Sequence, residues 1–172
     1  MKKLFKQFLL LGFVALTSTS CLKDKATTDY TNIQPVIIIP NANWPKNTST
    51  AATAVTVSTT PSLSVPVYAR VSWEKMLSNE LVVSFAKDEA DVAAYNTKFG
   101  TNYLPVPDAA ITAQSLKVTI PANTRDANIT VTVNTTRLDK TKTYMLPYKI
   151  IDASGQNLGV NYITYLYPFS LK

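Results

Sequence analysis

The chain has 172 residues, with 17 Lys and Arg against 11 Asp and Glu, and it contains one cysteine and no histidine. The missing histidine excludes the commonest general base and metal ligand, and with it every Ser-His or Cys-His catalytic arrangement. The four glycines are scattered along the chain, so no glycine-rich phosphate loop is present. We therefore expect no catalytic residue, no metal site and no cofactor.

The N-terminal 20 residues have the pattern of an export signal that ends at a cysteine. Three lysines precede an apolar stretch at residues 8–16, and a small polar run at 17–20 leads directly into Cys21. The apolar stretch is much shorter than the ~20 residues that a membrane-spanning helix needs. The segment resembles a bacterial lipoprotein signal, which implies that residues 1–20 are removed and that the Cys21 thiol carries lipid.

The signal also accounts for much of the positive charge. Three of the 17 basic residues lie in it, so the remaining 152 residues carry 14 basic and 11 acidic side chains, a net charge of +3. These basic residues form no block, which argues against nucleic acid as a partner. With Cys21 acylated, no thiol is left for a disulfide, so packing alone must hold the exported domain.

Residues 21–32 are polar and lack periodicity, and we expect them to tether a domain at 33–172 to the membrane. The charged pair Lys23–Asp24 is similar to the export tags of Bacteroidetes surface lipoproteins. We therefore expect an outer-membrane lipoprotein, anchored by its lipid and displayed on the cell surface or on the periplasmic face.

Beyond the tether, apolar and polar residues alternate with period two, which is typical of half-buried strands. The expected strands cover residues 33–39, 54–58, 63–71, 81–85, 116–120, 129–133, 144–150 and 160–167. Pro35 limits the first of them to a sheet edge or to the start of a strand. In 63–71 the apolar positions share one face, while Tyr68 and Arg70 lie on the other.

Residues 88–99 are the only segment with helical spacing. Asp88 is a suitable N-cap, acidic residues follow in the first turn, and Gly100 suits the left-handed residue that ends a helix. Seven or eight short strands with one inserted helix predict an all-β fold, a β-sandwich of two sheets.

An ordered set of motifs runs from the expected helix to the expected penultimate strand. It comprises Tyr95–Asn96, Gly100, Tyr103–Leu104–Pro105, Val118 to Asn123, Asn128 to Val133, Leu138–Asp139 and Tyr144 to Ile150. This set resembles the DUF1735 family of Bacteroidetes surface lipoproteins, a domain at the N-terminus of some family-18 glycoside hydrolases. The resemblance covers about residues 35–165. It implies an immunoglobulin-like sandwich from a glycan-handling system, which we expect to stand alone here without the catalytic part.

One departure from the family concerns a turn. Members often have glycine where this chain has Asn123. Asparagine is the next best residue for a positive φ, so we expect the turn to be retained.

Carboxylates cluster only at Asp88, Glu89 and Asp91, and helix capping explains all three. Glycoside hydrolysis needs two carboxyl groups about 5–10 Å apart in one cleft, and no such pair is indicated. A calcium loop of the Asp-x-Asp-x-Asp-Gly type is also missing from the sequence. We expect the chain not to be an enzyme.

Aromatic rings are the remaining candidates, because proteins bind sugars by stacking them on exposed rings. Trp44 lies in an expected loop flanked by asparagines, Trp73 follows a strand, and Tyr165, Tyr167 and Phe169 share one face of the last strand. The alternative is that these rings fill the sandwich. We predict a non-catalytic glycan-binding or accessory lipoprotein, with glycans or a neighbouring outer-membrane protein as partners.

A different class of function is also compatible with the pattern. The apolar segment 33–39 could be an added or exchanged strand of a structural or adhesive protein that docks a partner through its edge strands.

The lipid anchor is directly testable. The chain is expressed in a bacterium that acylates lipoproteins and is given labelled palmitate. The label should be incorporated into the parent chain, whereas the Cys21→Ser variant should take up no label and should leave the membrane fraction. A variant that fractionates as the parent does would contradict acylation at Cys21. Ser20→Ala leaves the thiol intact and is the matched control.

Overall fold

The computed structural model describes residues 34–45, 50–58, 61–112 and 115–172, and the expected signal, Cys21 and the tether lie outside them. The strands are β1 (Val36–Ile38), β2 (Val55–Val57), β3 (Ser62–Ser72), β4 (Leu81–Lys87), β5 (Leu104–Pro105), β6 (Lys117–Ile120), β7 (Asp126–Asn134), β8 (Thr143–Asp152), β9 (Asn157–Leu158) and β10 (Thr164–Leu171). The helices are α2 (Glu89–Phe99) and two short 3-10 turns, η1 (Asp108–Ala110) and η2 (Thr135–Arg137). No helix in the described ranges is long and apolar enough to cross a membrane.

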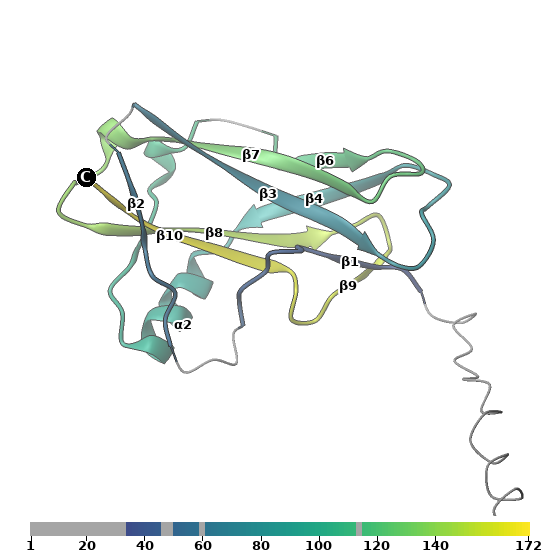
Figure 1. The fold of residues 1–172 in the computed structure, drawn as a ribbon, viewed down its shortest axis with the longest axis horizontal. Coiled ribbons are helices and arrows are strands. Elements are labelled where there is room, and N and C mark those ends of the chain that lie inside the picture. The colour runs from purple at the N-terminus through teal and green to yellow at the C-terminus, as the bar shows by residue number, and fades with distance from the viewer. Residues whose placement is uncertain (1–33, 46–49, 59–60, 113–114) are drawn as a thin grey trace, which may run out of the picture. The chain divides into compact units, whose positions relative to one another are not determined.

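The strands form two sheets that pack as a sandwich, so the predicted all-β fold class is confirmed (Figure 1). One sheet has the order β7-β3-β1-β9, and the other has the order β2-β10-β8-β4-β6, with β5 also paired to β8. Strands β5 and β9 were not expected because each has only two residues, too few to show alternation.

The core lies between the sheets and is built from the alternation seen in the sequence. In β3 every second residue from Val65 to Val71 is buried, while Pro66, Tyr68 and Arg70 between them are exposed. Strand β8 departs from this pattern because its residues 144–148 are all buried. One face of β8 fills the sandwich, and the other lies beneath α2.

The first strand is not at a sheet edge. Strand β1 begins directly after Pro35, as the proline allows, but it pairs antiparallel with β3 and parallel with β9. Ile37 and Ile39 are both 0% exposed in the main core. Both sides of β1 are therefore occupied within the domain, so of the two positions that Pro35 allows, the segment takes the start of a strand and not a sheet edge.

The helix forms as its end residues predict. The Asp88 side chain accepts a hydrogen bond from the backbone N–H of Ala90 at 3.1 Å, and Gly100 ends the helix with φ 62°. Asn123, which stands where family members often have glycine, has φ 59°, so the turn is retained as expected. The last strand begins at Thr164 rather than at 160, because Tyr162 and Gly159 form a turn closed by a 3.2 Å backbone hydrogen bond.

Replacing Ile37 tests whether β1 is part of the core. Ile37→Ala should lower the free energy of unfolding by about 2–5 kcal/mol, because it leaves a cavity at a fully buried site. Ile38→Ala, on the outward and half-buried neighbour, should cost clearly less. Denaturant unfolding followed by circular dichroism measures both, and equal losses would show that β1 does not have this orientation.

Candidate functional site

Trp44, the first predicted ring, lies in a small cluster between α2 and the six-stranded sheet. It is 9% exposed and packs with Val92, Tyr95, Met145 and Leu166. Its ring centroid lies 5.5 Å from that of Tyr95. Its ring faces are thus engaged by the protein itself, as the core alternative predicts.

The Trp44 indole is also held by a hydrogen bond. Its Nε1–H donates to Oδ1 of Asp91 at 2.9 Å, and the Thr164 hydroxyl donates to Oδ2 of Asp91 at 3.2 Å. Asp91 therefore ties α2 to both the loop and β10, a role that its position in the first helical turn did not reveal.

Asn43 positions this loop by forming strand-like hydrogen bonds with the backbone of β10. Its backbone N–H donates to the Thr164 carbonyl at 3.1 Å, and its side-chain amide exchanges two hydrogen bonds with the backbone of Leu166, at 2.7 and 2.8 Å. Strand β2 pairs with β10 further along, from Phe169 to Leu171. The outer edge of β10 is thus covered at both ends by the chain that connects β1 to β3.

The predicted row of rings on β10 exists, but it faces inward. Phe169 is fully buried, and Tyr165 and Tyr167 are half-buried against the main core. Neighbouring ring centroids are 6.2 Å apart for Tyr165 and Tyr167 and 6.1 Å for Tyr167 and Phe169. Burial also raises the pKa of Tyr165. These rings pack the sandwich, which is the alternative given for them.

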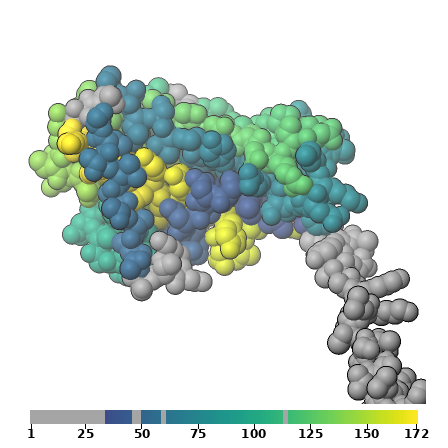
Figure 2. Space-filling model, viewed as in Figure 1, coloured from purple at the N-terminus to yellow at the C-terminus, as the bar shows by residue number. Residues whose placement is uncertain are grey.

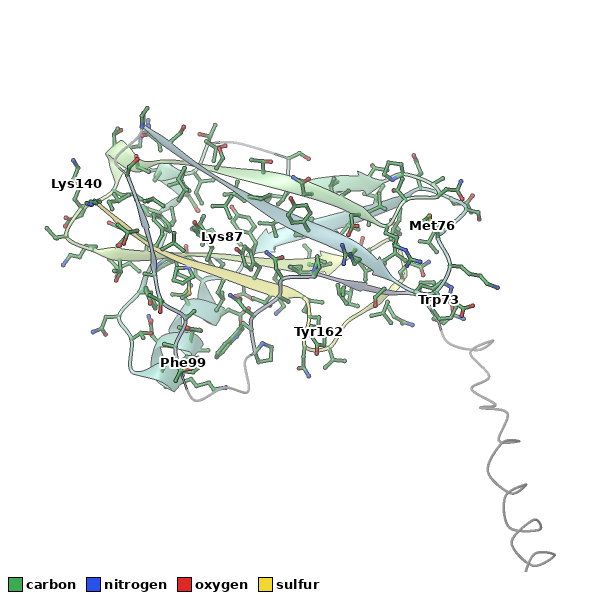
Figure 3. The ribbon with its side chains drawn as sticks, in the orientation of Figure 1. Trp73, Met76, Lys87, Phe99, Lys140 and Tyr162 are labelled. Atoms are coloured by element: carbon green, nitrogen blue, oxygen red, sulfur yellow. The ribbon has the colours of Figure 1, made fainter. Side chains whose placement is uncertain are left out.

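Trp73 lies apart from the other predicted rings. It is half-buried against the main core, and its backbone carbonyl accepts a hydrogen bond from Arg125. Figure 3 shows Trp73 beside Met76 at one end of the sandwich, far from Phe99, which packs near Trp44. A ligand-binding role for the predicted rings stays a prediction, and the structure does not bring them together as one exposed surface.

Acidic residues near the helix form ion pairs with lysines. Asp88 lies 3.4 Å from the Lys149 amine, while Lys87 contacts Glu89 at 2.6 Å and Asp108 at 2.7 Å. Burial lowers the pKa of Lys87, but its hydrogen bonds to Asp108 and Glu89 outweigh this effect and raise it. Within the described part of the chain, no group of three or more potential metal ligands is assembled.

The outer face of the four-stranded sheet is different, because it is open and carries an exposed ring. Tyr68 of β3 is 39% exposed, and the register places Asn128 of β7 directly opposite it. Thr130 faces Pro66 at the next outward position. In Figure 2 the purple residues of β1 lie among blue residues from the N-terminal half and yellow residues from the C-terminal end, so parts of both sheets are visible from this side.

A charge pair adjoins the Tyr68 ring. Arg70 Nε donates to Asp126 Oδ1 at 2.6 Å, and Arg70 Nη2 donates to Oδ2 at 3.2 Å. The pair is bidentate and both side chains remain exposed, at 46% and 39%. The hydrogen bond to Asp126, with its negative charge, raises the pKa of the Arg70 guanidinium.

A second exposed ring, Tyr162, lies on the far side of β1 from Tyr68. It is 58% exposed in the turn before β10, which Figure 3 shows at the rim of the sandwich. Two hydrogen bonds fasten this turn to β1, from Gly159 N–H to the Ile37 carbonyl at 2.9 Å and from Ile39 N–H to the Tyr162 carbonyl at 2.6 Å. A Cβ at Gly159 would lie 2.7 Å from Cγ2 of Ile38, so any other residue there would require the Ile38 side chain to shift.

Sequence reasoning missed both exposed tyrosines as candidates. For Tyr68 the signal was present, because the alternation in 63–71 puts Tyr68 and Arg70 on the outward face. For Tyr162 there was no such signal, since its exposure depends on how the turn docks on β1. The exposed chemistry on the four-stranded sheet is therefore a ring, an amide, hydroxyl groups and one charge pair.

Substitution of Trp44 tests its hydrogen bond to Asp91. Trp44→Phe should lower the free energy of unfolding by about 1.5–3 kcal/mol, because Asp91 loses its indole donor. Trp73→Phe is the matched control. It should lower the free energy of unfolding by less, since the Trp73 backbone carbonyl, and not its indole, makes the hydrogen bond with Arg125. Guanidinium unfolding measures both, and a loss no larger for Trp44→Phe would contradict this role.

Comparison with known proteins places the fold. The model of a family described as a "-like, N-terminal domain" matches residues 30–157. No curated protein matches the sequence. The chain is similar to a candidate carbohydrate-binding protein from Bacteroides ovatus ATCC 8483, with 18% identity and a TM-score of 0.61 over 79% of this chain and 37% of that one.

Two further solved structures share the fold. One is a multidomain protein including DUF1735 from Bacteroides ovatus, with 15% identity and a TM-score of 0.57 over 80% of this chain and 44% of that one. The other is EndoBT-3987 from Bacteroides thetaiotamicron with Man5GlcNAc product, with 20% identity and a TM-score of 0.55 over 69% of this chain and 28% of that one. This chain thus spans less than half the length of each structure.

The family match extends over most of the described domain, and the fold is shared with a structure that contains DUF1735. This chain belongs to the DUF1735 family of N-terminal domains.

Proposed function

We propose that this chain is a non-catalytic envelope lipoprotein whose sandwich binds glycans on the open face of the four-stranded sheet. The observation that carries the proposal is the exposed Tyr68 ring, which has Asn128 opposite it and the Arg70–Asp126 pair beside it. A pyranose ring presents an apolar face that stacks on tyrosine, and its hydroxyls take hydrogen bonds from amides and charged groups. This surface offers all of these groups side by side.

The acidic residues support a binding role rather than glycoside hydrolysis. Retaining and inverting hydrolases both need one carboxyl that gives up its proton and a second that acts on the sugar. Here Asp88 caps α2, Glu89 pairs with Lys87, and Asp91 accepts hydrogen bonds from Trp44 and Thr164. Each of these carboxylates is committed to holding α2 in place.

The relatives support the ligand class. EndoBT-3987 was crystallised with a Man5GlcNAc product, and the Bacteroides ovatus protein carries a name that points to carbohydrate binding. This chain corresponds to one part of each of those longer chains. We infer that the shared fold serves glycan-handling proteins as a binding or supporting unit.

The location belongs to the same proposal. Acylation at Cys21 would hold the domain at the outer membrane, and the polar residues 21–32 would let the sheet face reach glycans or a neighbouring outer-membrane protein. A single cysteine that carries two or more acyl chains is sufficient for stable anchoring in the membrane.

Loss of the Tyr68 ring should weaken glycan binding. The mature chain with Cys21→Ser should bind at least one member of a panel of yeast mannan, xylan and starch in isothermal calorimetry. Tyr68→Ala should weaken that binding about tenfold or more, a loss of at least ~1.4 kcal/mol, whereas Tyr68→Phe keeps the ring and most of the affinity. Met76→Ala, an exposed residue at the end of the sandwich, is the control.

Two results would contradict the proposal. One is binding by Tyr68→Ala that equals binding by the parent chain. The other is no heat from the parent chain with any member of the panel.

A further inference from the structure

The open face has an unusual charge inventory. Among the residues of β1, β3, β7 and β9, Arg70 and Asp126 are the only ones that carry charge. They lie opposite each other in the register and form the bidentate pair. The face is therefore neutral in sum, although the chain without its signal has a net charge of +3.

The nearby basic residues lie outside these strands, at the end of the sheet. The Arg125 guanidinium donates to the backbone carbonyls of Trp73 and Glu74, at the end of the sheet. Lys75 lies 3.9 Å from the Glu74 carboxylate in the same region. The Arg70 guanidinium is thus the only cation beside Tyr68 on these strands.

Asp126 determines what the Arg70 guanidinium can bind. A planar anion such as a uronate carboxylate binds arginine best through two parallel N–H groups. Asp126 already takes such a pair, from Nε and Nη2, and its own charge repels a second anion. Arginine has five N–H donors and a carboxylate about four acceptor positions, so neutral hydroxyl groups still find partners on both side chains.

We propose that this face selects uncharged glycans and that Asp126 is the residue that excludes acidic ones. This inference rests on the proposed function, since it concerns the glycan that the Tyr68 surface takes. Asp126 acts here as a specificity residue, because it blocks the guanidinium from the carboxylates or sulfates of an acidic glycan.

The decisive experiment uses two polymers with the same sugar backbone, one with charged carboxylates and one with neutral methyl esters (polygalacturonate and its methyl-esterified form), together with yeast mannan. The variants are made in the mature chain with Cys21→Ser. Asp126→Asn keeps the shape of the side chain and releases Arg70, so it should bind polygalacturonate about five- to tenfold more tightly than the parent. That gain should disappear at 0.5 M NaCl, because salt screens an exposed charge contact.

The double variant Arg70→Gln/Asp126→Asn is the matched control, and it should lose the gain because the cation is gone. Adding Tyr68→Ala to Asp126→Asn should also abolish it, which places the new binding on this face. Thermal unfolding of each variant checks that the fold is kept.

The outcomes separate this inference from the proposed function. If Asp126→Asn binds polygalacturonate no more tightly than the parent, the selection against acidic glycans is wrong, while loss of neutral glycan binding in Tyr68→Ala would still support the binding face. Parent binding to polygalacturonate as tight as to its methyl ester would also overturn the inference. If Tyr68→Ala binds neutral glycans as the parent does, the proposed function itself is wrong.

Discussion

The burial of β8 on both faces is the constraint on which the rest of this structure depends. Tyr144, Leu146, Tyr148 and Ile150 fill the space between the sheets, while Met145 on the opposite face lies beneath α2 with Trp44. An apolar residue on the outside of a sheet must be covered, and here the covering is the helix and the loop before β2. This requirement decides which of the two outer faces of the sandwich is closed.

The covering layer also closes an edge. Asn43 hydrogen-bonds to the backbone of β10 where the strand begins, and β2 pairs with it where the strand ends. An unpaired strand edge invites association with other chains, and covering it is one of the ways in which proteins prevent this. On the opposite sheet, the outward side chains of β3 are exposed in the described part of the chain.

The accessible face of the four-stranded sheet is therefore chemically simple. The ring of Tyr68, the amide of Asn128 and the Arg70–Asp126 pair come from two strands held in register over nine residue pairs. A rigid sheet presents such groups with little loss of entropy on binding, which is the advantage of preorganisation.

Local patterns in the sequence were sufficient for much of this description. The caps Asp88 and Gly100, the positive φ of Asn123 and the outward position of Tyr68 depend only on residue type and on neighbours in the chain. The period of two likewise predicted eight of the ten strands and the two-sheet sandwich. Such features are readable because the forces that produce them act within one turn or one strand.

Tertiary structure alone decided which residues meet. Trp44 and Asp91 are 47 residues apart, and Arg70 and Asp126 are 56 apart. The sequence therefore left open whether Trp44 is a platform or part of the core, and it gave no reason to pair Arg70 with Asp126. A period of two determines the face on which a side chain lies, but sheet order and register determine its partner, and both depend on packing across the whole domain.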